Sequence, residues 1–148
     1  MNLENHFKWI CTGVFLTSCM LGIAQTTPWE PMSSGVDGMV TAMHANGNNL
    51  YVGGYFNQAG GHTADGLAVW DGSHWSPLNP LENYAIRAIL YSDNTLYVGG
   101  RTAVDGCTHI AWYDGVNWHG LGTGFDEAVN ALTVFQNSLI HIICFECL

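Results

Sequence analysis

Positive charge is the scarcest feature of this 148-residue sequence. Lys8, Arg87 and Arg101 are its only lysine and arginine residues, against 12 Asp and Glu, and the formal net charge is −9 with the histidines neutral. A chain of this sign repels phosphate backbones, and no basic stripe along the sequence overrides the repulsion. The composition therefore excludes nucleic acid as a partner.

Long apolar runs are also missing, apart from "WICTGVFLTSCMLGIA" at Trp9–Ala24, which follows a short charged segment. This pattern predicts a secretory signal peptide at residues 1–24, cleaved after Ala24. The run is shorter than the roughly 20 residues that cross a bilayer, so an uncleaved membrane anchor is the second choice and we expect only transient membrane contact. The third interpretation is a lipoprotein, because "LTSC" resembles a lipoprotein cleavage box ending at Cys19. All three interpretations predict a secreted or cell-surface protein.

Cysteines are too few to organise the fold. After Ala24 only Cys107, Cys144 and Cys147 remain, and an odd number gives no disulfide framework. Cys144 and Cys147 have the C-x-x-C spacing of a redox pair or half a metal site, but no second such pair follows. The sequence assigns these three cysteines no role.

Motifs that carry catalysis are absent as well. The chain has no G-x-S-x-G, no H-E-x-x-H and no phosphate-binding loop. Its histidines do not recur in register, and its Asp-Gly pairs lack the dense spacing of a calcium loop. We therefore predict no catalytic, cofactor-binding or metal-binding residue and no cofactor, and we favour a protein without catalysis of its own.

What the sequence does contain is a repeat. "LYVGGYF" at Leu50 returns as "LYVGGRT" at Leu96, 46 positions later. "GLAVWDGSHWSPL" at Gly66 matches "HIAWYDGVNWHGL" at His109, 43 positions later. Periods of 43 to 46 residues without helical patterning are typical of propeller blades. Asp-Gly pairs between alternating apolar runs favour hairpins, so tight turns are expected at Asp71-Gly72 and Asp114-Gly115, with a further turn at Asp93-Asn94.

Each repeat divides into four short strands, which in the first unit are expected at residues 40–45, 50–56, 67–70 and 74–78, with a Gly-rich loop at 57–66. The predicted fold is all-β: a partial β-propeller with two complete four-stranded antiparallel blades and an incomplete third. The expected organisation is a signal peptide (1–24), a remnant of a preceding blade (25–38), blade 1 (39–81), blade 2 (82–124) and an incomplete blade 3 with an aberrant tail (125–148).

The residues that recur in register are interpreted as structural. Paired glycines within a strand indicate a position where side chains do not fit. The recurring aromatic residues are expected to supply packing between blades. These repeat landmarks are Gly53, Gly54, Gly99, Gly100, Trp70, Asp71, Gly72, Trp75, Tyr113, Asp114, Gly115 and Trp118.

The repeated L-Y-V-G-G and [WY]-D-G-x-x-W segments resemble kelch-like β-propeller repeats, especially those of secreted bacterial surface proteins. The spacing differs from standard kelch repeats, because only four residues separate Trp70 from Trp75. A rigid scaffold of this kind favours a binding, adhesion or structural module, with residues 57–65 and 102–109 as candidate loops for a protein or a glycan. The alternative is a fragment of a secreted propeller enzyme, carbohydrate-active or an oxidase, whose catalytic residues lie in missing blades.

The third repeat changes before its second strand is complete. In register, its Gly-Gly would fall at positions 142 and 143, where the sequence has Ile142 and Ile143. Propellers use typically four to eight blades. We expect the chain to be a fragment whose ring is closed by further blades of a longer protein, with self-association of several copies as the alternative.

Overall fold

The computed structural model describes residues 30–78, 82–136 and 138–143. From Pro31 onward they belong to one compact unit. The predicted signal peptide, Cys19 and the C-terminal Cys144 and Cys147 lie outside the described residues.

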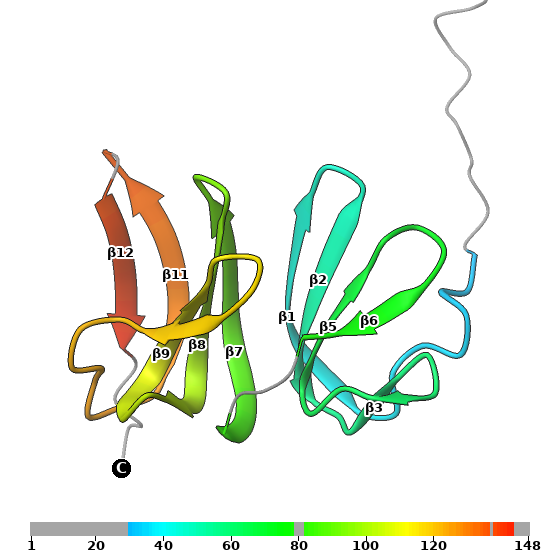
Figure 1. Cartoon of the computed structure of the whole chain (residues 1–148), viewed down its shortest axis with the longest axis horizontal. Helices are drawn as coiled ribbons and strands as arrows, with labels where there is room; N and C mark the ends of the chain where they lie inside the picture. The colour runs from blue at the N-terminus through cyan, green and yellow to red at the C-terminus, as the bar shows by residue number, and fades with distance from the viewer. Residues whose placement is uncertain (1–29, 79–81, 137, 144–148) are drawn as a thin grey trace, which may run out of the picture. The chain divides into compact units, whose positions relative to one another are not determined.

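Within these residues the chain is all-β, with no helices and with antiparallel sheets (Figure 1). This confirms the all-β class and the antiparallel sheets expected from the repeat. The strands are β1 (Met39–Asn46), β2 (Asn49–Tyr55), β3 (Gln58–Ala59), β4 (His62–Thr63), β5 (Leu67–Trp70), β6 (Trp75–Pro77), β7 (Glu82–Ser92), β8 (Thr95–Val104), β9 (Cys107–Tyr113), β10 (Trp118–Gly120), β11 (Val129–Phe135) and β12 (Ser138–Ile143).

Two four-stranded sheets have the same topology. The first has the order β1-β2-β5-β6 and the second β7-β8-β9-β10, so each is a meander in chain order, apart from the small β3-β4 hairpin between β2 and β5. A third sheet contains β11 and β12. In Figure 1, β7 stands beside β1 and β2, and β11 stands beside β7 and β8, in agreement with the contacts between these strands. Strands 46 or 43 residues apart therefore occupy equivalent places.

The connections between the second and third strands differ from the expected loops. In the first sheet the Gly-rich segment contains the β3-β4 hairpin. In the second sheet, β8 and β9 continue to a turn at Asp105 and Gly106, because this connection is three residues shorter and leaves no room for a side hairpin. Cys107, which we expected in a loop, is therefore the first residue of β9 and is buried.

Two kinds of hairpin turn join the strands. Asp93 and Asn94 form a two-residue turn with φ of 48° and 61°, which is the geometry of the turns that best match strand twist. Asp71 and Gly72, expected to form a tight turn of their own, instead begin a four-residue loop, because Trp70 pairs with Trp75. Gly72 carries the positive φ (99°) that this loop requires.

A carboxylate holds this four-residue loop, and another holds its equivalent in the second sheet. Oδ1 of Asp71 accepts hydrogen bonds from the amides of Ser73 and His74, at 2.8 and 2.7 Å. The amide of His74, followed by that of Ser73, lowers the pKa of Asp71 to about 2. Hydrogen bonds to an ionised carboxylate favour its charged form, so each loop depends on that charge.

The equivalent loop of the second sheet is held in the same way. Oδ1 of Asp114 accepts hydrogen bonds from the amides of Val116 and Asn117, at 2.8 and 2.7 Å. The amide of Asn117 and the side chain of His119, which lies 2.9 Å from Oδ2, lower the pKa of Asp114 to about 2. The two Asp-Gly landmarks therefore stabilise their loops through the aspartate side chain as well as through the glycine.

These lowered pKa values predict a stability that falls in acid. An aspartate with a folded-state pKa of about 2 and an unfolded value of about 3.9 stabilises the fold above pH 4 and loses that contribution as the pH falls through 2. The double variant Asp71→Asn/Asp114→Asn keeps one acceptor oxygen in each loop but removes both titrating carboxyl groups. Urea unfolding between pH 2 and 7 should show a smaller acid loss for the double variant than for the wild type, and parallel pH profiles would contradict the assignment.

The first glycine of each Gly-Gly pair is the point where the next sheet packs. A Cβ on Gly53 would lie 2.5 Å from Cγ2 of Ile86 on β7, and a Cβ on Gly99 would lie 2.6 Å from Cγ1 of Val129 on β11. Ile86 and Val129 are themselves 43 residues apart. The same contact therefore joins the first sheet to the second and the second to the third.

The second glycine faces backbone within its own sheet. A Cβ on Gly54 would lie 2.1 Å from the carbonyl oxygen of Met39, and a Cβ on Gly100 would lie 2.0 Å from that of Ala85. Gly100 also has a φ of 151°, a conformation that favours glycine. Both glycines are therefore required by the close approach of the neighbouring strand.

Tryptophan indoles join each repeat to the one before it. Nε1 of Trp75 donates to the carbonyl oxygen of Met32 at 2.8 Å, and Nε1 of Trp118 donates to that of Leu78 at 3.2 Å. Leu78 lies three residues after Trp75, and Met32 lies three residues after Trp29, so the acceptors are equivalent as well as the donors. Each indole is almost fully buried.

The apolar core lies between the sheets as well as along them. One buried cluster combines Leu67 of the first sheet with Ile86, Ile89, Leu96, Val98, Ala111 and Trp118 of the second. Another combines Cys107 and Ile110 of the second sheet with Val129 of β11. Leu67 and Ile110 are repeat equivalents. The same apolar contact is therefore used at both junctions.

Candidate functional site

The first strand of each sheet carries a bulge at the same repeat position. The register shifts at Thr41 in β1, at Arg87 in β7 and at Asn130 in β11. These bulged residues bond from sheet to sheet: the Thr41 hydroxyl donates to the carbonyl oxygen of Ile86, and Nη1 of Arg87 donates to Oδ1 of Asn130 at 3.0 Å. Bulges redirect side chains and are common beside functional sites.

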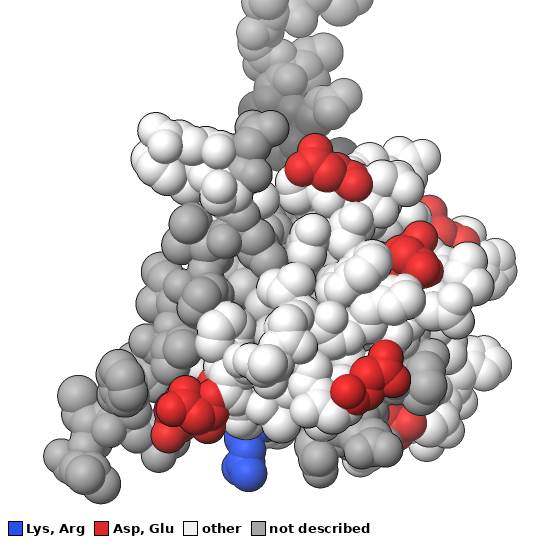
Figure 2. Space-filling view, turned by 60° about the vertical axis from the view of Figure 1, so that its left-hand side comes forward, with Lys and Arg blue, Asp and Glu red and all other residues white. Residues whose placement is uncertain are grey.

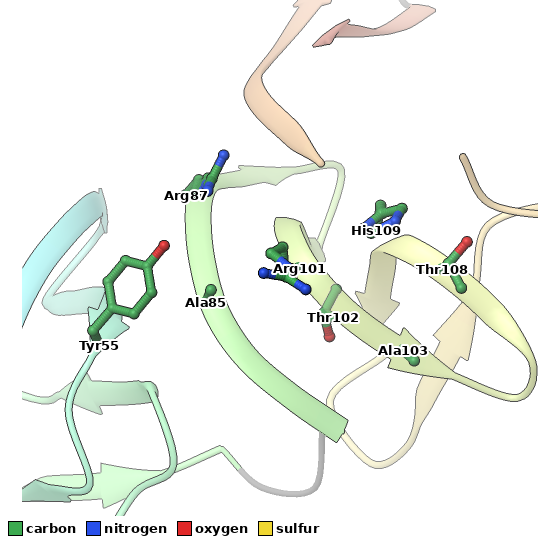
Figure 3. Close-up of a pocket in the computed structure, with 8 residues that line it drawn as sticks. All are labelled: Tyr55, Ala85, Arg87, Arg101, Thr102, Ala103, Thr108 and His109. Carbon is green, nitrogen blue, oxygen red and sulfur yellow. The ribbon is translucent and has the colours of Figure 1, made fainter. Parts of the chain in front are cut away.

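A cavity of about 440 Å³ lies next to the Arg87 bulge. Figure 3 shows Tyr55 and Arg101 on either side of β7, with His109 and Thr108 beyond β8. This volume is within the range of small-molecule sites. Its lining residues are Tyr55, Ala85, Arg87, Arg101, Thr102, Ala103, Thr108 and His109.

The Gly-Gly pairs place two of these side chains. Tyr55 follows Gly54 at the end of β2, and Arg101 follows Gly100 in β8, so the two are repeat equivalents. Tyr55 is 41% exposed, which leaves its ring accessible to a ligand. The chain thus uses one repeat position twice, once for an aromatic ring and once for a cation.

An irregularity between β8 and β9 places the histidine. Gly99 pairs with Ile110 and Ala103 pairs with Thr108. Between these pairs, β8 has three residues where β9 has only one, His109. His109 has a φ of 70°, and Nδ1 of its ring lies 3.1 Å from the carbonyl oxygen of Gly100. A carbonyl only accepts, so Nδ1 is the donor. The left-handed backbone costs a side-chain-bearing residue about 1–2 kcal/mol.

Thr102 makes room for the cavity. Its repeat equivalent in the first sheet, Phe56, is buried in an apolar cluster. Thr102 is only 2% exposed, and its hydroxyl has no hydrogen-bond partner among the described residues. A buried hydroxyl without a partner costs about 1–3 kcal/mol. The smaller, polar residue therefore leaves both space and an unsatisfied hydrogen-bonding group.

Both arginines of this acidic chain line the same cavity. Among the described residues the only ion pair joins His119 to Asp114, so no described carboxylate neutralises Arg87 or Arg101. On the face drawn in Figure 2, acidic side chains form separate patches, and basic side chains are visible only at the lower edge. The positive charge of the described structure is thus concentrated at one site.

The two loops proposed from the sequence have different places in the structure. Residues 102–109 contribute Thr102, Ala103, Thr108 and His109 to the cavity lining, whereas residues 57–65 contribute none. The repeat landmarks position the sheets and do not line the cavity. Sequence reasoning missed Tyr55, Arg87 and Arg101, although the arginines are the only two in the chain and depart from the repeat.

Within the part of the chain that the structure describes, no cluster of three His, Cys, Asp or Glu side chains is arranged to hold a metal ion. The same residues contain no helix with the length and apolar character needed to cross a membrane.

Comparison with family models, with curated protein sequences and with solved structures finds no match to this chain.

Proposed function

We propose that the chain is an exported segment of a kelch-like β-propeller that works as a binding module, without catalysis of its own. Support comes from two sheets with the same strand order, joined by equivalent glycine and tryptophan contacts. The apolar N-terminal run supports export. The rest of the ring would come from further blades of a longer chain or from other copies.

The observation that carries the binding function is the cavity, where an accessible aromatic ring faces hydrogen-bonding side chains. Tyr55 supplies the ring, and Arg101 and His109 lie across β7 from it (Figure 3). Small-molecule sites combine apolar and aromatic surface with a few fixed polar groups, and a sugar can use both: its ring face packs on an aromatic ring and its hydroxyls form hydrogen bonds. We propose a glycan as the ligand class, with a protein as the alternative.

An array of immobilised glycans tests this function. The purified chain should bind a subset of the glycans, and Tyr55→Ala should lower the bound signal by about tenfold, which corresponds to the loss of one aromatic contact. Phe135→Ala is the matched control, because Phe135 is an exposed aromatic residue outside the cavity lining. If no glycan is bound, or if both variants bind equally, the proposed function is wrong.

A further inference from the structure

Four positions at which the second repeat departs from the first in size or charge line one cavity. Where the first repeat has threonine, tyrosine, phenylalanine and glycine, the second has two arginines, a threonine and a histidine. The lining residues, with their counterparts, are Arg87 (Thr41), Arg101 (Tyr55), Thr102 (Phe56) and His109 (Gly66). The repeats also differ elsewhere, as at Trp112 (Val69) and His119 (Ser76), but these four departures lie together where a ligand can enter.

Two of these departures disfavour folding. Gly66 adopts a φ of 80° without cost, whereas His109 holds a φ of 70° with a side chain. Thr102 buries a hydroxyl without a partner where Phe56 fills an apolar cluster. Strain and unsatisfied groups that persist in a structure are concentrated at functional sites.

The donors in the cavity share one chemistry. Arg101 and Arg87 present planar guanidinium groups, which match the paired oxygens of carboxylates and phosphates. Arg87 is held by Asn130 and is therefore oriented before a ligand arrives. The His109 ring already donates its Nδ1 hydrogen to the carbonyl oxygen of Gly100, so the arginines supply the donors to the ligand. The Thr102 hydroxyl is closed to solvent, so Thr102 contributes space to the cavity and not a donor to the ligand.

We infer that the cavity binds an oxyanion, a carboxylate or a phosphate, carried by a ligand about the size of one or two sugar rings. The inference rests on the proposed binding function and names the chemistry of its ligand. In a chain of net charge −9, the two unneutralised arginines make this cavity the place where an anion is attracted. Binding should weaken with added salt, because Arg101 is exposed.

Titration of the purified chain, followed by amide NMR shifts at constant ionic strength, tests the inference. The probes are inorganic phosphate, D-glucuronate and the neutral D-glucose. We expect saturable shifts at Arg101, Thr102 and His109 with at least one of the two anions, and a much weaker response to glucose. Saturation by phosphate alone assigns a phosphate ligand, and saturation by glucuronate alone assigns a carboxylate.

Variants separate binding from folding. Arg101→Gln should weaken anion binding by at least about tenfold, the effect of losing a charged hydrogen-bonding group. His109→Gly restores the residue of the first repeat and Thr102→Val removes the buried hydroxyl, so both variants should unfold at a higher temperature than the wild type. His119→Gln is the control with unchanged affinity, because His119 lies outside the cavity lining.

The inference is overturned if neither anion saturates, if glucose binds as tightly as glucuronate, or if Arg101→Gln keeps the wild-type affinity. Its failure is distinguishable from failure of the proposed function. Binding of neutral glycans that depends on Tyr55 but not on Arg101 would retain the binding module and reject the oxyanion. Saturation by phosphate without binding of any glycan on the array would retain the oxyanion site and reject the glycan as the ligand.

Discussion

Replacing Gly100 with alanine is expected to lower the free energy of unfolding by about 3 kcal/mol or more, the upper part of the range for overpacked sites. The new Cβ would meet the carbonyl oxygen of Ala85 at 2.0 Å and the amide nitrogen of Arg87 at 3.0 Å. Both atoms are backbone, so no side-chain rotation relieves the contact. Urea unfolding monitored by tryptophan fluorescence measures the loss.

Gly106→Ala is the matched control. Gly106 also has a positive φ, of 75°, but a Cβ there has no atom within 4 Å. Its substitution should cost only the conformational strain of about 1–2 kcal/mol. A Gly100 variant no less stable than the Gly106 variant would show that the strands do not approach each other as closely as described.

Trp118→Ala is expected to be the most damaging single truncation, with a loss of about 3–5 kcal/mol. The ring packs in the cluster shared by the two sheets and lies 5.0 Å from the ring of Tyr113. Its indole also donates to Leu78, 40 residues away in the chain. Trp118→Phe should cost less than the alanine variant, because it keeps most of the buried area and loses the hydrogen bond, worth about 0.5–1.5 kcal/mol.

Trp112 provides the comparison for Trp118. It is only partly buried, it stacks on His119, and its indole donates within its own sheet to Gly120. Trp112→Phe should therefore change stability less than Trp118→Phe, as chemical denaturation can measure. Equal effects of the two variants would contradict a role for Trp118 in joining the sheets.

Much of the strand arrangement could be predicted because it depends on periodic features. Residues 67–70 were expected as a strand and form β5, and the Gly-Gly pairs mark places where a side chain would clash. The turn at Asp93 and Asn94 was also expected. Alternation, paired glycines and turn residues act locally, so a single sequence displays them.

The cavity could not be predicted in this way, since it depends on side chains brought together from four strands, β2, β7, β8 and β9. Arg87 reaches it through a bulge, and His109 through an irregular pairing that no local pattern indicates. Cys107 was placed in a loop because the shorter second connection was not expected to continue as paired strands. The substitution of Thr102 for a buried phenylalanine becomes informative only when Phe56 is known to be buried.

The central claim is that equivalent contacts stack the sheets and so form the cavity between Tyr55 and Arg101. Nuclear Overhauser effects in the methyl-labelled chain test it most directly. The α-protons of Gly53 should show effects to the methyl groups of Ile86, and those of Gly99 to the methyl groups of Val129. Effects across the strands of each sheet without either of these inter-sheet effects would contradict the stacking.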